Sequence, residues 1–357
     1  MIRHLRLSFS LLLLIAASIL PTTSHAQLPP WTRYTMSNGL EVLIIENHLT
    51  PIATIELAVK NGSFTEPADY NGLSHLYEHM FFTANAVDTS ESDFLQRVGR
   101  NGIIYNGTTH EENVEYYFTL PKKNLVNGLE FMADAIMSPA FREDELKEQI
   151  AIVLGEFDRH ESNPFFNYNR KLALALWGPG NISRKQPLGE RSTISATTRQ
   201  KMLAIKAKYY IPNNSLLIVA GDVNTEEVKR LIEQYFGEWK AGPDPFATDP
   251  PTRTPPLDSV KTIVDIVDVP TVHAGLRWHG PSIGIDDKAT FAADVFLYIV
   301  LQQEHEYRKK LEETGLAQNI TFWYYTQRYV GPISADITTT ADKLTETMRT
   351  FWQQINK

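Results

Sequence analysis

The sequence contains no cysteine among its 357 residues. Disulfide bonds, thiolate metal ligands, a cysteine nucleophile and a lipid anchor on an N-terminal cysteine are therefore excluded. Basic residues are also outnumbered, because 34 Lys and Arg against 42 Asp and Glu give a formal net charge of −8. No basic patch is evident along the chain. We therefore expect neither nucleic acid nor an anionic membrane as a partner.

Long apolar runs are absent except at the N-terminus. There, Arg3 and Arg6 precede an apolar run at residues 7–20, and Ser24-His25-Ala26 offers small residues at the cleavage positions. This order is typical of a secretory signal peptide, although an uncleaved membrane anchor is the alternative. We predict a signal peptide at residues 1–26, a periplasmic or secreted location, and no membrane association after cleavage.

The length favours two domains, and the order of the expected elements repeats along the chain. Before the linker we expect strands at 33–36, 40–46, 52–60, 103–109, 114–120 and 214–221, and helices at 72–83, 90–98, 122–137, 143–162, 165–177, 197–210 and 225–239. After the linker we expect strands at 260–269, 272–278, 317–326 and 332–339. We also expect a helix at 286–303, a short helix that ends at 314, and a helix that begins at 341. The helix at 225–239 is expected to be capped by Thr225.

This repeat predicts an α+β fold with two related domains, each an antiparallel or mixed sheet with helices packed on one face. We expect an N-terminal catalytic, metal-binding domain at 30–240, a linker with six prolines at 241–259, and a second domain without a metal motif at 260–357. The second copy stops before the equivalent of the strand at 214–221, so we expect it to be C-terminally incomplete.

A metal-binding pattern lies on the helix expected at 72–83. His75, Glu78 and His79 are spaced so that they share one helix face. Two imidazoles four residues apart form half of a zinc site, and the adjacent carboxylate can take a proton from a metal-bound water. A catalytic zinc usually has a third protein ligand, and Glu156 is a candidate because it ends an apolar run on the long helix at 143–162.

With this spacing the chain resembles the pitrilysin/insulysin-like inverzincin metallopeptidases, which include mitochondrial processing peptidase and many bacterial secreted members. Their pattern is a glycine, His-x-x-Glu-His, and a ligand glutamate some 75 residues further on. Here these are Gly72, the motif at 75–79, and Glu156, which lies 77 residues after His79. Residues 106–109, followed by Glu115-Tyr116-Tyr117, are similar to the family's substrate-binding edge strand and its partner.

The resemblance implies a zinc-dependent endopeptidase that hydrolyses extended peptides or small unfolded proteins. His75, His79 and Glu156 would bind one zinc per chain, and Glu78 would be the base that activates the bound water. Asn106, Gly107 and Thr108 would bind the substrate backbone as an added strand, although Asn106 is also a common turn residue. Gln149 would lie behind the ligands, where relatives usually carry a glutamate.

The second domain departs from the family pattern. Relatives carry an Arg and a Tyr that contact substrate across the cleft, and the run at 311–318 has neither, although Arg308, Tyr324 and Tyr325 are close. This predicts a homologous partner subunit that carries the Arg/Tyr pair, in a heterodimer. The alternative function is a catalytically weak or silent peptide-binding subunit that needs a partner chain.

Three further features have simple structural interpretations. We expect His110 to be a solvated loop residue, although it lies near the edge strand and could bond substrate. Glu111-Glu112 is expected to be a charged turn between two strands. Phe81 and Phe82 are expected to pack in the core.

Overall fold

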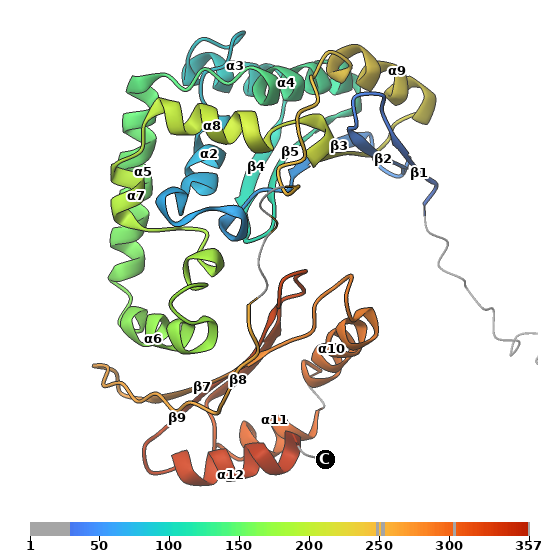
Figure 1. Ribbon diagram of the computed structural model, residues 1–357. Coiled ribbons are helices and arrows are strands. Elements are labelled where there is room, and N and C mark those ends of the chain that lie inside the picture. The colour runs from blue at the N-terminus through green and yellow to red at the C-terminus, as the bar shows by residue number, and fades with distance from the viewer. Residues whose placement is uncertain (1–28, 248–249, 251–253, 303–304, 356–357) are drawn as a thin grey trace, which may run out of the picture.

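The computed structural model describes residues 29–247, 250, 254–302 and 305–355. The chain forms two lobes, and each contains its own β-sheet (Figure 1). The first sheet is six-stranded and mixed, with the order β1-β2-β6-β3-β5-β4, and the second is three-stranded and antiparallel, with the order β7-β9-β8. The predicted α+β fold with two related sheets is therefore confirmed. The predicted signal peptide lies outside the described residues.

The first lobe holds most of the helices. Its strands are β1 (Trp31–Thr35), β2 (Glu41–Glu46), β3 (Ile52–Val59), β4 (Ile104–Thr109), β5 (Val114–Pro121) and β6 (Ser215–Gly221). Its helices are α2 (Leu73–Phe81), α3 (Glu91–Asn101), α4 (Leu125–Met137), α5 (Glu143–Glu161), α6 (Phe166–Trp177), α7 (Arg191–Ser195), α8 (Arg199–Tyr209) and α9 (Thr225–Phe236). Alternate residues of β3 and β5 are buried, which is the period that a sheet with one covered face requires.

The first sheet positions the site through its edge. Among the described strands, β4 pairs only with β5 and so ends the sheet, whereas β3 lies between β5 and β6. Helix α2 packs against β4 and β5 on one side and α5 on the other. The rings of Phe81 and Tyr116 stack with centroids 3.9 Å apart, so α2 is fixed to the sheet by aromatic packing. Phe81 is buried and Phe82 packs against the same core, as expected.

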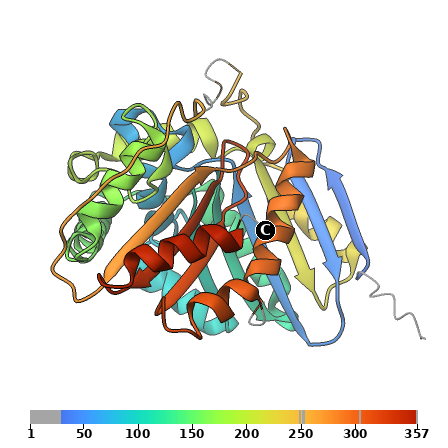
Figure 2. The ribbon, with the colours of Figure 1, turned by 90° about the horizontal axis from the view of Figure 1, so that it is seen from below.

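The second lobe repeats part of this plan. It contains β7 (Val272–His279), α10 (Asp287–Val300), α11 (Glu306–Leu311), β8 (Asn319–Tyr324), β9 (Pro332–Thr339) and α12 (Leu344–Ile355). The sheet order β7-β9-β8 matches β3-β5-β4. Two α-helices lie between β3 and β4 in the chain, and two lie between β7 and β8. Figure 2 shows α10 and α12 on the face of the second sheet that is turned away from the first lobe.

The prediction of a strand at 260–269 is wrong. These residues form no strand, and Val260 and Ile266 are 98% and 97% exposed. A cavity of about 930 Å³ is lined by residues 257–265 and by β7. In the first lobe β2 pairs with β6 rather than with β3, and no described residue supplies a strand in the corresponding place beside β7. Alternating apolar residues without a partner strand cannot form a ladder.

Two smaller differences concern helices. The cap of α9 is Asn224, whose side chain accepts the backbone N–H of Glu227, and not the predicted Thr225. Helix α7 was not predicted, because five residues are too few to show a helical period. Among the described residues of 241–259 there is no helix or strand, and Phe246 packs against the first lobe.

Candidate metal centre

Helix α2 begins at a glycine that no other residue could replace without strain. Gly72 has φ 93°, and a Cβ atom there would lie 2.7 Å from the backbone oxygen of Leu188. The helix then buries its apolar side, which comprises Leu73, Leu76, Tyr77, Met80 and Phe81. Its other side carries His75, Glu78 and His79, which are partly exposed. The predicted common face of these three side chains is present.

The first turn of α2 is held by a buried carboxylate that the sequence did not reveal. Glu66 accepts the backbone N–H groups of Gly72 and Ser74 at 2.8 and 2.6 Å, and the side-chain amide of Asn71 at 3.3 Å. These N–H groups are among those that a helix leaves unpaired at its start, so Glu66 satisfies them and complements the helix dipole. Burial raises the pKa of the Glu66 carboxyl, while its hydrogen bonds with Ser74, Gly72 and Asn71 lower it.

Helix α5 brings a third donor to the two histidines. Oε2 of Glu156 lies 3.5 Å from Nε2 of His75 and 3.9 Å from Nε2 of His79. One ligand atom from each residue lies within 4.8 Å of the others. Tetrahedral metal ligands about 2.0–2.2 Å from zinc are roughly 3.4 Å apart, so this donor set fits such an ion with small side-chain adjustments.

Both imidazoles are in surroundings that suit a metal ligand. Burial, and then the charge of His79, lower the pKa of His75 to about 4, so His75 is neutral above mildly acidic pH. Nδ1 of His79 lies 3.2 Å from Oε1 of Gln149, a buried residue on the same face of α5 as Glu156 and two turns before it. When Nδ1–H donates to that oxygen, the lone pair of Nε2 is directed to the centre of the group.

Glu78 lies beside this group and is held by the edge strand. Oε2 of Glu78 accepts a hydrogen bond from the hydroxyl of Thr109 at 2.7 Å. Gly107 on the same strand faces Glu78, because a Cβ atom at residue 107 would lie 2.8 Å from Cγ of Glu78. Burial raises the pKa of Glu78, against the hydrogen bond from Thr109, which lowers it. A carboxylate with a raised pKa is a stronger base.

The predicted substrate-binding residues lie on the free edge of the sheet next to Glu78. Asn106 and Thr108 are exposed on β4, and Gly107 lies between them against the α2 side chain. The side-chain oxygen of Asn106 accepts the backbone N–H of Gly107 at 3.0 Å. Of the described strands, only β5 pairs with β4, so its outer edge is available to an extended chain.

The second lobe reaches the same edge through Tyr325. Its hydroxyl lies 2.8 Å from Nδ1 of His110 in an exposed contact, so this loop histidine has a partner in the second lobe. Of the other two residues near the expected Arg/Tyr position, Arg308 pairs with Glu312, and Tyr324 donates to the backbone oxygen of Pro281.

The turn at Glu111-Glu112 also does more than connect two strands. Glu112 accepts backbone N–H groups from Arg328 and Tyr329 of the second lobe, each at 2.8 Å. These contacts could not be found from the sequence, because they join residues more than 200 positions apart.

The described helices include none whose length and apolar content would allow it to cross a membrane.

Comparison with known proteins identifies two family models along the chain. Residues 41–179 match the model described as Insulinase (Peptidase family M16), and residues 196–357 match the model described as Peptidase M16 inactive domain. The zinc protease PqqE of Helicobacter pylori is 27% identical over 273 residues, which are 73% of this chain and 58% of that protein. The chain spans between 21% and 58% of the length of such curated relatives.

Solved structures share the fold. The crystal structure of a protease from Helicobacter pylori has a TM-score of 0.80 at 21% identity, and covers 91% of this chain and 80% of that one. The first half of the periplasmic protease PqqL from Escherichia coli has a TM-score of 0.67 at 16% identity, and covers 91% of this chain and 73% of that one.

Proposed function

The chain belongs to the insulinase family of peptidases, family M16, and we propose that it is a zinc-dependent endopeptidase that hydrolyses extended peptides or small unfolded proteins. His75, His79 and Glu156 hold one zinc per chain. The convergence of their three ligand atoms from α2 and α5 is the observation that carries the proposal. Relatives named as zinc proteases support the choice of metal.

A zinc ion held by these three residues would supply Lewis acidity, both to the scissile carbonyl and to a bound water. Glu78 accepts the proton of the attacking water and passes it to the leaving amine, and its raised pKa suits both steps. Thr109 holds the Glu78 carboxylate by its hydroxyl, so that the base faces β4. Gln149 fixes the tautomer of His79, because its side-chain oxygen accepts a hydrogen bond from Nδ1–H of His79.

The substrate lies along β4 as an added strand. The outer edge of β4 offers backbone N–H and C=O groups, and this mode binds a peptide through its main chain. Asn106, Gly107 and Thr108 contact it next to the base. Gly107 has no side chain, which allows the peptide backbone and Glu78 to approach each other closely.

Glu78→Gln is the direct test of the base. The amide keeps the shape of the side chain but cannot accept a proton, so peptide cleavage should fall by at least about 100-fold while zinc content is unchanged. Glu148→Gln is the matched control, because Glu148 is exposed on α5 beside Gln149. A Glu78→Gln chain that cleaves at the parent rate would exclude this role.

The domain division and the export of the chain are proposed on the same family likeness. We place the catalytic domain at residues 30–240, the linker at 241–259 and the second domain at 260–357. Export to the periplasm or the outside, after removal of residues 1–26, agrees with the description of PqqL as periplasmic. A mature N-terminus at residue 27 in protein purified from the producing cell, determined by mass spectrometry, would test export.

A partner subunit is also proposed. The similarity to the first half of PqqL supports a homologous partner that completes the cleft with an Arg/Tyr pair. The alternative is a silent peptide-binding subunit, with which the inactive-domain match at 196–357 is compatible. Strong cleavage by the lone chain would remove the need for a partner, whereas zinc binding without cleavage would favour the silent subunit.

A further inference from the structure

The loop that joins β8 to β9 (residues 325–331, the β8–β9 loop) is fastened to the first lobe. The Glu112 carboxylate accepts the backbone N–H groups of Arg328 and Tyr329, each at 2.8 Å. Lys185 donates to two main-chain carbonyls of the same loop, each at 2.9 Å. Hydrogen bonds to charged groups are stronger than neutral ones, so the loop is held from two sides.

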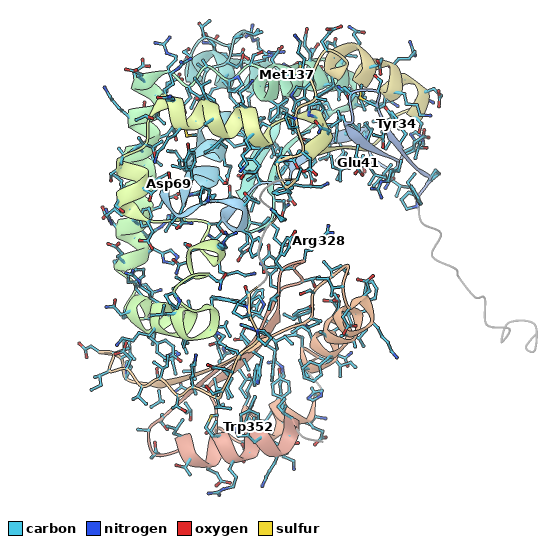
Figure 3. The ribbon with its side chains drawn as sticks, in the orientation of Figure 1. Tyr34, Glu41, Asp69, Met137, Arg328 and Trp352 are labelled. Atoms are coloured by element: carbon cyan, nitrogen blue, oxygen red, sulfur yellow. The ribbon has the colours of Figure 1, made fainter. Side chains whose placement is uncertain are left out.

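Aromatic packing strengthens this attachment. The rings of Phe64 and Tyr329 stack with centroids 4.4 Å apart, and the Lys185 ammonium lies 5.3 Å from the Phe64 ring. Burial lowers the pKa of Lys185 to about 8, which marks an environment with little water. Figure 3 shows Arg328 where the two lobes meet. The loop is therefore part of a packed junction.

This junction lies at one end of the edge strand. Strand β4 ends at Thr109, and His110 opens the turn to β5, where its backbone N–H donates to the carbonyl of Asn113 at 2.9 Å. The hydroxyl of Tyr325 lies 2.8 Å from Nδ1 of His110. The second lobe thus contacts the residue that directly follows Thr109, the last residue of β4.

The proposed base, Glu78, lies near that same end. Glu78 contacts β4 at Gly107 and Thr109, so the base faces the last three residues of the strand. From Thr109 to His110 is one residue, about 3 Å along the strand, whereas from Gly107 back to Ile104 is three residues, about 10 Å. The open edge is therefore unequal on the two sides of Glu78.

We propose that Tyr325 and the β8–β9 loop close one end of the β4 edge, and so limit how many peptide residues bind on that side of the scissile bond. About two residues fit before His110 and Tyr325, and about four pair with β4 on the Ile104 side. This rests on the proposed peptidase function and makes Tyr325 a specificity-determining residue. The substrate class is peptides cut close to one end of their bound segment.

The test measures binding length without cleavage. In the zinc-loaded full chain with Glu78→Gln, fluorescence anisotropy gives the affinity of fluorescein-labelled unstructured peptides that are lengthened one residue at a time from either end. We expect each added residue to strengthen binding by about 2- to 10-fold on the open side, over about four residues. On the closed side the gain should stop after about two.

Tyr325→Ala in the same background should extend the gain on the closed side by two or more residues, and His110→Ala should do the same from the first lobe. Tyr325→Phe, which keeps the ring, should give a smaller extension. Tyr298→Ala is the control, because Tyr298 is exposed on α10. Equal gains at both ends in the starting chain, or an unchanged profile in folded Tyr325→Ala and His110→Ala, would overturn the proposal. The proposed peptidase function is tested separately from binding length. Cleavage by the parent chain without zinc would exclude that function, yet the dependence of affinity on peptide length could still be measured.

Discussion

Replacing Gly107 with alanine should damage catalysis, because the added methyl group would collide with the proposed base. A Cβ atom at residue 107 would lie 2.8 Å from Cγ and 3.0 Å from Oε1 of Glu78, and 3.0 Å from Cε2 of Phe82. Non-bonded carbon atoms are most stable about 3.5–4.0 Å apart, so Glu78 has to move by roughly 1 Å. Phe82 packs against Tyr105 with centroids 5.0 Å apart and leaves little room on its side.

A shift of about 1 Å at a reacting group can lower a rate by about 100-fold, which is about 3 kcal/mol of transition-state stabilisation. We therefore expect kcat for a quenched fluorescent peptide to fall by about 100-fold in Gly107→Ala, with zinc content and thermal stability close to those of the parent. The three heavy atoms nearest to the new methyl group belong to Glu78 and Phe82, and none of them belongs to the ligands His75, His79 and Glu156.

Gly155→Ala is the matched control. Gly155 immediately precedes Glu156 on α5, and a Cβ atom there would meet no described atom within 4 Å. Alanine is favoured over glycine inside a helix by up to about 1 kcal/mol, so this variant should be as stable and as active as the parent. The reasoning is refuted if folded, zinc-loaded Gly107→Ala keeps activity within about threefold of the parent.

Three further outcomes follow from other contacts. Glu66→Ala leaves two buried N–H groups of α2 without an acceptor and should cost about 2–4 kcal/mol in urea unfolding, more than Glu66→Gln; a loss under about 0.5 kcal/mol would contradict the capping role. In zinc-free protein the pKa of His75 is about 4 in the folded chain, below the ordinary 6.5. Between these two values the unfolded chain binds more protons than the folded one. The free energy of unfolding should therefore fall by up to about 3 kcal/mol as the pH is lowered from 6.5 to 4. His75→Gln should flatten that dependence, and equal pH slopes would contradict it. Glu112→Ala should loosen the β8–β9 loop and speed its cleavage by trypsin at Arg328, whereas an unchanged rate would contradict its role as the acceptor.

The metal-centre geometry was accessible from the sequence because it depends on local periods. The spacing of His75, Glu78 and His79 places them on one face of any helix, and Glu156 is a candidate ligand because it ends an apolar run on a second helix. The helix and strand order of both lobes was predicted for the same reason. The α+β fold and the shared face of the motif therefore needed no knowledge of long-range contacts, whereas the family resemblance implied the place of Glu156 as the third ligand.

The remaining features depend on contacts between distant segments. Residues 260–269 alternate like a strand, yet a strand forms only where a neighbour supplies hydrogen bonds, and β2 shows that this neighbour is not the next strand in the chain. Glu66 acts from a loop before α2, and Lys185 and Tyr325 act across the lobe junction. No periodic pattern marks such residues, because their partners are set by the tertiary fold.

The proposed peptidase activity depends most directly on a single metal bound by His75, His79 and Glu156. The measurement is a titration of zinc into chelator-treated, metal-free full chain, with hydrolysis of an unstructured peptide recorded at each addition. We expect no hydrolysis before zinc is added and a rise that ends at one equivalent per chain. Hydrolysis by the metal-free chain, or a rise that ends away from one equivalent, would contradict this metal site.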